Sequence, residues 1–237
     1  MRVSIVVPTK NEEHYLPLLL ASLRGQTYQD FEVIVADAAS TDRTRELAQA
    51  SGARVVDGGM PGPGRNRGAA VANGELIFFF DADVTLPHPR LLEDSLEEFD
   101  ERALDVAGCP LGVQEGTLLD RALHEAYNKY TSAVQPLLPH SAGAGILVKK
   151  SVHVALGGFD ETIVFAEDHD YARRAHKAGY RTGLLRCHKI DISPRRYRKE
   201  GMVRTAAKMV WSEASILVRG PLQSIPFTYN FGDFAPA

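Results

Sequence analysis

The sequence predicts an α/β fold in which a mainly parallel sheet carries helices on both faces. In the first half of the chain, short apolar runs alternate with stretches whose apolar residues recur at helical spacing. Strands that alternate with helices in this way are typical of a parallel sheet with right-handed crossovers. The 237 residues, 44% of them hydrophobic and 24% charged, suffice for a hydrophobic core. We therefore expect one α/β domain with a smaller appended part.

The first half shows four strand-like runs. Residues 3–7 are almost all β-branched, the pattern of a strand buried on both faces, and Pro8 ends this run. Helical spacing then continues up to Gly25, and Ser40 to Asp42 offer an N-cap for a second helix that ends near Gly52. The expected strands are residues 3–7, 31–36, 53–56 and 75–80, and a Gly/Pro-rich loop at residues 58–64 precedes a short alanine-rich helix.

The second half is less regular and mixes helices with strands. Gly179 follows a helical stretch at the position where a glycine often ends a helix. A basic helical segment is expected near the C-terminal end. The expected helices are residues 90–99, 118–134 and 168–178, and the expected strands are residues 104–109, 145–149 and 180–186.

Composition excludes several classes of protein. The chain has 27 Lys and Arg against 30 Asp and Glu, a net charge of −3, which argues against a nucleic-acid partner. Its two cysteines, Cys109 and Cys187, are far apart, so we expect neither a disulfide framework nor a Cys-x-x-Cys metal site. The apolar run at residues 3–7 is too short for a signal peptide, and no run reaches the length of a membrane-spanning helix. We expect a cytoplasmic protein in a reducing compartment.

Polar residues directly follow three of the expected strands. In an open parallel sheet, ligands bind beyond the carboxyl ends of the strands. These ends carry Pro8 to Glu12, Asp37 to Asp42 and Asp81 to Asp83. Any one of these segments could be an ordinary loop or helix cap, but three at successive strand ends favour a binding site.

Asp81 and Asp83 are the clearest candidates. The apolar strand at residues 76–80 runs directly into them, so both carboxylates lie at its end, where they repel each other unless a cation is close. A divalent ion held by one or two carboxylates and by a substrate's phosphates resolves this repulsion. The alternative is a helix N-cap before Pro87.

Further motifs extend this pattern along most of the chain. In order, the motifs are Ser4–Glu13, Asp37 with Ser40–Asp42, Arg65–Gly68, Ala72–Glu75, Asp81–Asp83, Gly157–Glu161, Glu167–Arg174 and Ala178–Tyr180. With them, the chain resembles a family 2 glycosyltransferase of the GT-A fold over residues 1–190. The resemblance implies a Rossmann-like nucleotide-binding sheet with helices on both faces, a mixed second half that binds the acceptor, and a helical C-terminal tail.

The resemblance implies a nucleotide-sugar donor, linked to UDP or GDP, and a Mn²⁺ or Mg²⁺ cofactor held by Asp83 together with Asp81. A carboxylate such as Asp37 also suits a nucleoside on chemical grounds, because it accepts hydrogen bonds from base imides and ribose hydroxyls. Arg65 would pair with phosphate oxygens, or else form an ordinary ion pair. The implied donor-binding residues are Pro8, Thr9, Glu12, Asp37, Arg65, Asp81 and Ala82.

The resemblance also implies inverting chemistry with a carboxylate base. Asp168 matches the family's base, and Glu167 is the alternative base. The simpler explanation for Asp168 is that a negative charge at the start of a helix is favoured by the helix dipole. The segment Gly143-Ala144-Gly145 could leave room for an acceptor or form a tight turn. His188 is a poor match to a further metal-binding histidine of the family. The Gln-x-x-Arg-Trp signature of processive synthases is absent, which favours transfer of a single sugar to a hydroxyl or phosphate.

The basic tail suggests where an acceptor approaches. Arg195 and Arg196 begin a basic stretch that could contact the phosphate of a polyprenyl phosphate; a sugar or a protein acceptor is also compatible. Residues 195–219 have helical amphipathicity with a tryptophan, which is compatible with peripheral contact to the inner membrane face. Packing on the catalytic domain and a homodimer interface are the alternatives. The expected division is a domain at residues 1–190, with 1–85 binding the donor and 86–190 the acceptor, and a tail at residues 191–237.

Two other functions compete with glycosyl transfer. An apolar strand that ends in Asp81 also resembles the first motif of haloacid-dehalogenase-type phosphatases, in which this aspartate is the nucleophile. That interpretation leaves Pro8 to Glu12 and the Asp37 loop without a role. The other competitor is a non-catalytic module that binds a membrane or a partner.

Overall fold

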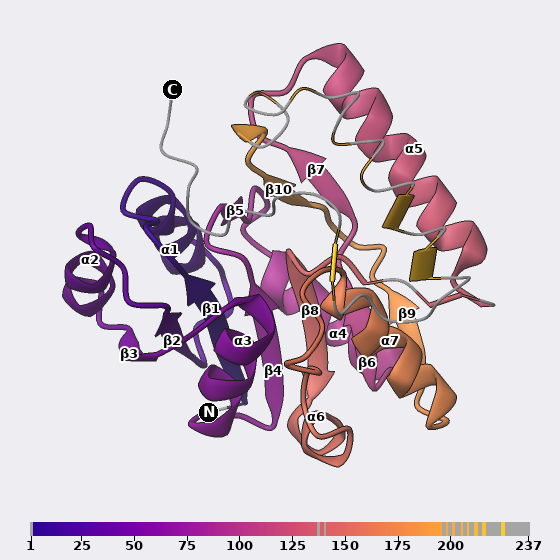
Figure 1. The fold of residues 1–237 in the computed structure, drawn as a ribbon, viewed down its shortest axis with the longest axis horizontal. Coiled ribbons are helices and arrows are strands. Elements are labelled where there is room, and N and C mark those ends of the chain that lie inside the picture. Colours follow the sequence, from indigo (N-terminus) through magenta and orange to yellow (C-terminus); the bar gives the residue numbers. More distant parts are fainter. Residues whose placement is uncertain are drawn as a thin grey trace.

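A computed structural model describes residues 2–136, 138–139 and 141–195, and in the tail residues 198, 201, 205, 208, 211–212, 215–216 and 224–225. Within these residues, seven strands form one central sheet (Figure 1). Their order across the sheet is β3 (Arg54–Asp57), β2 (Phe31–Asp37), β1 (Val3–Thr9), β4 (Leu76–Phe80), β8 (Gly145–Lys149), β6 (Val106–Gly108) and β9 (Thr182–Leu184).

The direction of the strands decides which loops meet at the carboxyl edge of the sheet, where the parallel strands end. The four strands from β3 to β4 are parallel, so their carboxyl ends lie at one edge. Strand β8 runs antiparallel to β4, with Gly145 opposite Phe80. The start of β8 therefore lies beside the end of β4, and the loop before β8 joins the same edge. The expected α/β sheet is confirmed, with the antiparallel strand as the departure from a purely parallel one.

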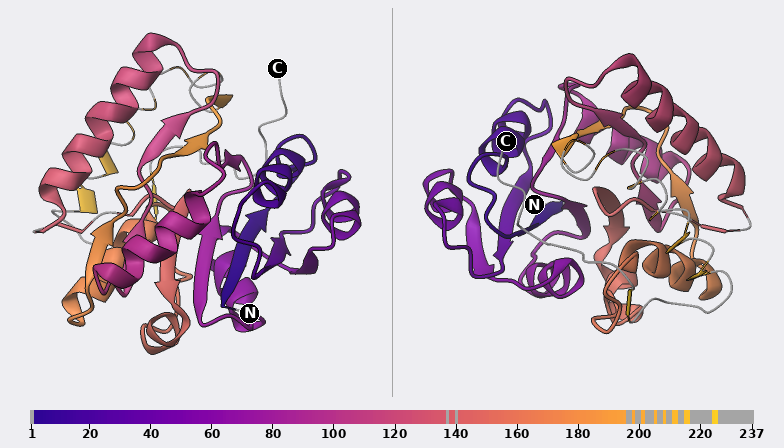
Figure 2. Two further views of the ribbon diagram at one scale, coloured as in Figure 1. Left: turned by 180° about the vertical axis from the view of Figure 1, so that it is seen from behind. Right: turned by 45° about the horizontal axis from the view of Figure 1, so that its top comes forward.

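Helices cover both faces of the sheet (Figures 1 and 2). Alternate residues of a strand point to opposite faces, so Ile5 and Phe78 pack in one core and Val6 and Phe79 in the other. The first core is covered by α1 (Leu16–Arg24), α2 (Thr44–Ala50) and α4 (Leu91–Glu101). The second is covered by α3 (Pro61–Ala70), α6 (Lys150–Ala155) and α7 (Glu167–Lys177).

A second, smaller sheet stands above the first core. It consists of β5 (Val84–Thr85), β10 (Ile190–Ile192) and β7 (Leu111–Val113), with β10 antiparallel to β5 and parallel to β7. Helix α5 (Leu118–Val134) lies along this sheet (Figure 1), held to β7 by two hydrogen bonds between Asn128 and the Leu111 backbone at 2.8 and 2.9 Å. These strands were not predicted from the sequence, because runs of two or three residues show almost no periodicity.

Three further details correct or extend the expected elements. Helix α3 begins at Pro61, inside the expected loop at residues 58–64, because a proline in the first helical turn loses no intrahelical hydrogen bond. The N-cap expected within Ser40 to Asp42 is wrong by one residue: Arg43 is the N-cap of α2 and its side chain makes no cap hydrogen bond, while Asp42 Oδ1, just before it, accepts the Thr44 N–H at 3.0 Å. Strand β10 crosses the division expected after residue 190, and the division itself stays a prediction.

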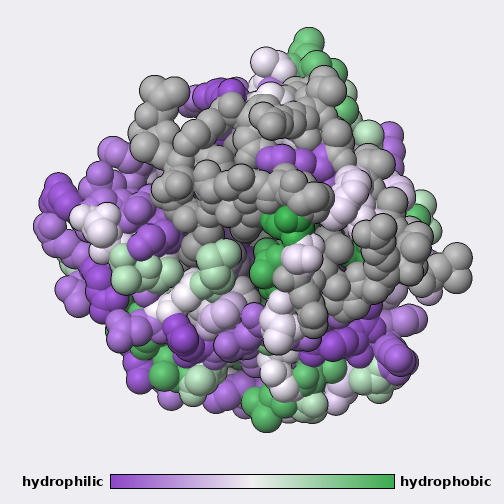
Figure 3. Space-filling view, viewed as in Figure 1, coloured by the Kyte–Doolittle hydropathy of each residue, from purple (hydrophilic) through white to green (hydrophobic). Residues whose placement is uncertain are grey.

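The surface and the tail bear on membrane contact. Figure 3 shows hydrophilic side chains over α2 and β3 and hydrophobic ones at the top, where α5 begins and exposes Leu118 and Leu119. None of the helices in the described part of the chain is long and apolar enough to cross a membrane.

Arg196 and most of the predicted tail lie outside the described residues. Thr205, Ser212 and Ile216 are described and buried, and their spacing places them on one helix face.

One buried histidine makes the stability of the second core depend on pH. The His153 ring packs against the rings of Phe79 and Phe159, and its Nδ1 lies 2.9 Å from the Tyr171 hydroxyl. Burial lowers the pKa of His153 to about 4, and the positive charge of Arg174 acts in the same direction. Because the ordinary value is 6.5, the contribution of neutral His153 is complete above pH 6.5 and is lost as the pH falls toward 4.

The variant His153→Gln should flatten the pH dependence of the unfolding free energy. Between pH 7 and pH 4 the wild type should lose about 3 kcal/mol more than this variant, because protonating the buried ring costs roughly 1.4 kcal/mol per pKa unit. Urea unfolding at a series of pH values measures the difference. His176→Gln, at an exposed position in the last turn of α7, is the control and should keep the wild-type slope. Equal slopes for His153→Gln and the wild type would contradict the prediction.

Candidate active site

The residues expected to act in catalysis and donor binding meet at the carboxyl edge of the central sheet. Asp81 and Asp83 follow β4 directly, and Arg65 reaches Asp81 from the middle of α3. Glu167 and Asp168 begin α7 on the same face of the sheet. A buried strand on one side and two packed helices on the other fix the positions of these side chains.

A buried guanidinium joins three parts of this edge. Arg65 is only 2% exposed, and its Nη1 donates to Glu167 Oε1 at 2.7 Å. Its Nη2 donates to Asp81 Oδ1 at 2.8 Å and to the Gly143 carbonyl at 3.2 Å. Burial by itself lowers the pKa of Arg65, but Asp81 and Glu167 outweigh it and raise the pKa above its ordinary value. Arg65 therefore stays charged and ties β4, α7 and the loop before β8 together.

Gly143 connects this guanidinium to the expected base. Its N–H donates to Asp168 Oδ2 at 2.5 Å, while its carbonyl accepts from Arg65. A Cβ at this position would lie 2.7 Å from Arg65 Nη2 and 3.1 Å from Asp168 Oδ2. A side chain therefore does not fit without moving one of these two groups, which explains a glycine here. We refer to Arg65, Asp81, Gly143, Glu167 and Asp168 as the Arg65 network.

The start of α7 is positioned by the segment around Phe159. The Asn66 side chain donates to the Phe159 carbonyl at 2.9 Å and accepts its N–H at 2.8 Å. Gly158 has φ +75° and a Cβ there would meet Asn66 Oδ1 at 2.5 Å, so only glycine fits. Ala166, which precedes α7, has φ 59°, a strained value for a residue with a side chain. Backbone strain of this kind persists where surrounding contacts fix the chain, as they do here.

A second guanidinium occupies the other side of the edge. Arg195 Nη1 and Nη2 donate to the two carboxylate oxygens of Glu12 at 2.7 and 2.6 Å, and its Nε donates to Asp83 Oδ2 at 3.0 Å. The guanidinium also lies over the ring of Tyr15, 4.4 Å from its centroid. Burial raises the pKa of Glu12 to about 7, although Arg195 lowers it. A hydrogen bond of 3.1 Å from the Ser193 N–H to the Asp83 carbonyl brings Arg195 to this place.

The loops after β1 and β2 are tied to each other. Asp37 is buried, and its carboxylate accepts from Thr9 Oγ1, Ser40 N, Ser40 Oγ and Arg45 Nη1 at 2.5–3.2 Å. Its expected contact with a nucleoside stays a prediction, and its oxygens here organise the loop. The side chains of Pro8, Thr9 and Ala82 are also buried, so contacts from these residues to a donor would come from the backbone.

The donor atoms at this edge fit a hard divalent cation. Asp81 and Asp83 offer carboxylate oxygens, the ligands that Mg²⁺ and Mn²⁺ prefer. Each carboxylate uses one oxygen in an ion pair, Asp81 Oδ1 with Arg65 and Asp83 Oδ2 with Arg195. The second oxygen of each carboxylate lies outside these ion pairs. Asp83 and Glu12 already accommodate one positive group, which shows that the edge favours a cation.

The structure separates the expected site residues into groups. It brings Arg65, Asp81, Glu167, Asp168 and Gly143 together, and Ala144 and Gly145 follow Gly143 into β8. Arg195, expected near the acceptor, instead contacts Glu12 and Asp83. His188 lies elsewhere, beside His88 and Asp94. The roles of Asn66 and of the Arg195 ion pair were missed, and Arg195 and Glu12 are 183 residues apart, a separation at which no local motif links them.

Removing the Arg65 charge should destabilise the protein strongly. Arg65→Met would leave Asp81 and Glu167 beside an apolar side chain, and breaking a buried ion pair by removing one partner costs about 3–5 kcal/mol of unfolding free energy. Urea unfolding measures the loss. Arg43→Met is the matched control, because Arg43 and Glu46 are both about two-thirds exposed and solvent screens their pair, so its loss should change the unfolding free energy little. Similar losses for the two variants would refute the assigned role of Arg65.

Known proteins of similar sequence are glycosyltransferases. The chain is 34% identical over 116 residues to the poly(ribitol-phosphate) beta-N-acetylglucosaminyltransferase TarS of Staphylococcus aureus, which covers 45% of this chain and 20% of TarS. It is 30% identical over 247 residues to the pre-mycofactocin glycosyltransferase of Mycobacterium tuberculosis, covering 97% of this chain and 50% of that protein. The chain thus spans between a fifth and a half of the length of these two curated relatives.

Solved structures share the fold. The crystal structure of TarS residues 1–349 matches with a TM-score of 0.64 and 24% identity, covering 84% of this chain and 63% of TarS 1–349. The mannosyltransferase PcManGT of Pyrobaculum calidifontis, solved with GDP-Man and Mn²⁺, matches with a TM-score of 0.69 and 22% identity, covering 89% of this chain and 64% of the other. The expected GT-A fold is confirmed.

A family model decides between the competing interpretations. The model described as Glycosyl transferase family 2 matches residues 4–156, which is more than half of the chain and runs from β1 into the end of α6. This stretch includes Arg65, Asp81 and Asp83 in the sheet edge described above. The phosphatase interpretation of Asp81 is therefore wrong. The chain belongs to glycosyl transferase family 2.

Proposed function

We propose that this protein transfers a single sugar from a nucleoside diphosphate sugar to a hydroxyl or phosphate acceptor, with inversion at the anomeric carbon and with a divalent metal. The observation that carries the proposal is the meeting of the Asp81–Asp83 edge with Asp168 through Arg65 and Gly143. Proteins of the same fold support the donor class, since TarS has been solved with UDP and UDP-GlcNAc and PcManGT with GDP-Man and Mn²⁺.

Asp83, together with Asp81, would hold the metal at the end of β4. A bound Mg²⁺ or Mn²⁺ would neutralise negative charge on the departing diphosphate. The remaining donor contacts would come from backbone groups of the loops after β1 and β4 and from Glu12. Arg195 reaches the same place, and its guanidinium is suited to phosphate oxygens once it leaves Glu12 or Asp83.

Asp168 fits the role of general base better than Glu167. Glu167 Oε1 accepts from the buried Arg65 guanidinium, which holds this carboxyl group in place, although burial raises its pKa. Asp168 accepts the N–H of Gly143 and lies in the first turn of α7, where the helix dipole favours its negative charge. In the reaction the acceptor oxygen bonds to the anomeric carbon, the bond from that carbon to the diphosphate oxygen breaks, and the acceptor proton passes to Asp168.

The acceptor would enter from the side of the loop before β8. Gly143-Ala144-Gly145 adjoins Asp168, so a hydroxyl near the base would lie against this segment. The acceptor classes are a sugar, a lipid phosphate or a protein. Peripheral membrane contact through residues 195–219 and a homodimer remain predictions for the tail, and Arg196 belongs to its undescribed part.

Replacing the base and the metal ligand should abolish transfer without unfolding the protein. Asp168→Asn should lower kcat by about 10²- to 10⁴-fold, the usual contribution of a positioned base, and Asp83→Ala should remove the dependence of the rate on Mn²⁺. Release of nucleoside diphosphate from UDP- and GDP-sugars, with and without acceptors, measures both. Asp100→Asn, a half-exposed carboxylate in the last turn of α4, is the control and should leave the rate unchanged. Wild-type activity in Asp168→Asn would contradict the assignment of Asp168 as the base. If the wild type neither transfers sugar nor hydrolyses the donor, the non-catalytic module is favoured instead.

The Arg195 guanidinium should compete with a metal for Asp83. Arg195→Gln removes one positive charge beside Asp83 Oδ2, so Mn²⁺ should bind the variant about tenfold more tightly, equal to ~1.4 kcal/mol of relieved repulsion. Calorimetric titration of Mn²⁺ without nucleotide measures this. Arg45→Gln, which removes a charge from the nearby Asp37 loop, is the control and should have a smaller effect. Unchanged or weaker binding to Arg195→Gln would show that the two cations do not compete.

A further inference from the structure

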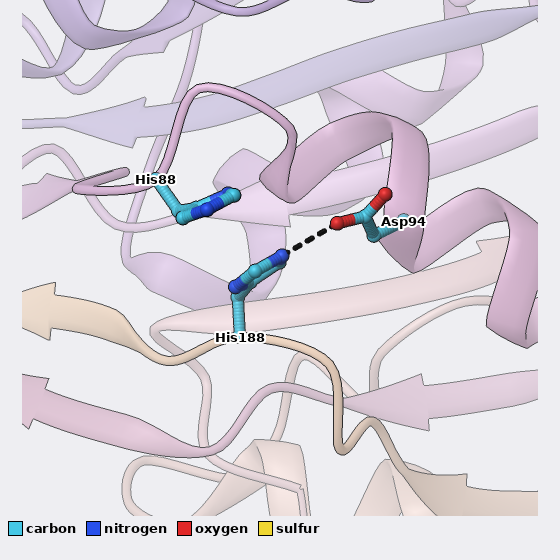
Figure 4. Close-up of side chains that lie close together, drawn as sticks. All are labelled: His88, Asp94 and His188. Atoms are coloured by element: carbon cyan, nitrogen blue, oxygen red, sulfur yellow. Dashed lines mark hydrogen bonds and ion pairs between the residues drawn. The ribbon is translucent and has the colours of Figure 1, made fainter.

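Two histidines from distant parts of the chain face each other outside the active site. Strand β10 pairs antiparallel with β5, with Asp191 opposite Thr85. Continuing this register by three residues places His188 opposite His88. The two rings stack with centroids 3.8 Å apart and an angle of 15° between their planes (Figure 4).

A carboxylate from α4 completes a group of three donors. Asp94 Oδ2 lies 2.6 Å from His188 Nε2, and Figure 4 shows the three side chains converging from three different segments. One donor atom from each of His88, Asp94 and His188 lies within 4.8 Å of the other two. Donors of one tetrahedral zinc are about 3.4 Å apart when each bond is about 2.1 Å. Small side-chain rotations close this difference, since, among the described residues, only the stacked His188 ring and a long 3.3 Å hydrogen bond from the Arg90 N–H to its Nδ1 hold the exposed His88 side chain.

The charge around the three donors matches a divalent cation. Arg90 pairs with the other oxygen of Asp94 at 2.8 Å, and also with Glu93 at 2.9 Å and Glu97 at 3.9 Å. The carboxylates of Glu93, Asp94 and Glu97 and the guanidinium of Arg90 together carry a charge of −2 beside the two imidazole rings. A dication bound here would bring this ion-pair cluster to neutrality, while Arg90 keeps Asp94 oriented.

The types of donor atom in this group indicate a metal ion that binds both nitrogen and oxygen ligands. Two imidazole nitrogens and one carboxylate oxygen suit Zn²⁺, whereas Mg²⁺ and Mn²⁺ prefer sites made of oxygen. We propose that His88, Asp94 and His188 bind Zn²⁺, with water as the fourth ligand. The ion joins the segment before α4 to the segment before β10.

This zinc site is separate from the metal site proposed at Asp83. The same register places residue 193 opposite Asp83, in agreement with the hydrogen bond from Ser193 N–H to the Asp83 carbonyl. Five residues of extended chain, about 17 Å, separate that point from His88 and His188. The zinc ion would affect the active site only indirectly, because it would hold β10, the strand that leads to Arg195. The proposal does not depend on the chemistry assigned to Asp168.

Zinc titration of the full chain tests the proposal. Calorimetry with ZnCl₂ in excess Mg²⁺, which occupies oxygen-only sites, should show one Zn²⁺ per chain for the wild type. His88→Ala and His188→Ala should weaken binding by roughly 100-fold or more, because losing even an outer partner of a metal ligand costs about 10- to 100-fold. Saturating Zn²⁺ should raise the Tm of the wild type but not of these variants.

Three controls make the outcome decisive. His176→Ala removes an exposed histidine on α7 and should bind Zn²⁺ like the wild type, and Asp83→Ala should also retain it. His88→Gln, a change at an exposed side chain, keeps the Asp94–His188 contact intact and should still lose zinc. Wild-type affinity in the His88 and His188 variants, or no zinc binding by the wild type in excess Mg²⁺, would overturn the proposal and leave only the hydrogen-bonded contact between Asp94 and His188.

Discussion

The buried charge of Arg65 is the constraint on which the rest of the site depends. A guanidinium that is 2% exposed must be matched by carboxylates, and it takes Asp81 from the sheet and Glu167 from α7. Its remaining contact, with the Gly143 carbonyl, draws in the loop before β8. One buried charge therefore links the start of α7 to the acidic end of β4.

A second guanidinium gives the site its asymmetry. Arg65 comes from within the domain and is enclosed, whereas Arg195 reaches Glu12 and Asp83 from the segment after β10. The two cations flank Asp81 and Asp83 and offset part of the repulsion among the carboxylates of this edge before any ligand binds. The net charge of −3 conceals this local pairing of opposite charges. A donor with its metal would have to exchange with Arg195, while Arg65 stays.

The sequence was informative where the pattern is local and uninformative where distant segments meet. The apolar run before Asp81 predicted β4 and the acidic edge, and the family motifs predicted the neighbourhood of Arg65 and Asp168. The strands β5, β7 and β10 could not be predicted, because two or three residues show no periodicity. The Arg195 contacts could not be predicted either, because they join residues far apart in the sequence. The hydrogen bonds that Asp37 accepts from Thr9 and Arg45 likewise join different elements, so no spacing in the sequence reveals them.

The antiparallel direction of β8 has a consequence for how such a chain can diversify. Residues 114–144, between β7 and β8, leave from the small sheet and return at Gly145, directly beside the end of β4. Both ends of this excursion are fixed by strand pairing, while α5 in its middle contacts the rest mainly through the small sheet. Apart from Gly143 and Ala144, which contact Arg65, Asp168 and Asp81, its length and side chains can therefore change without moving Asp81 or Asp83. The fold thus separates an acidic edge, which the central sheet holds in place, from a segment between β7 and β8 that can vary on its own.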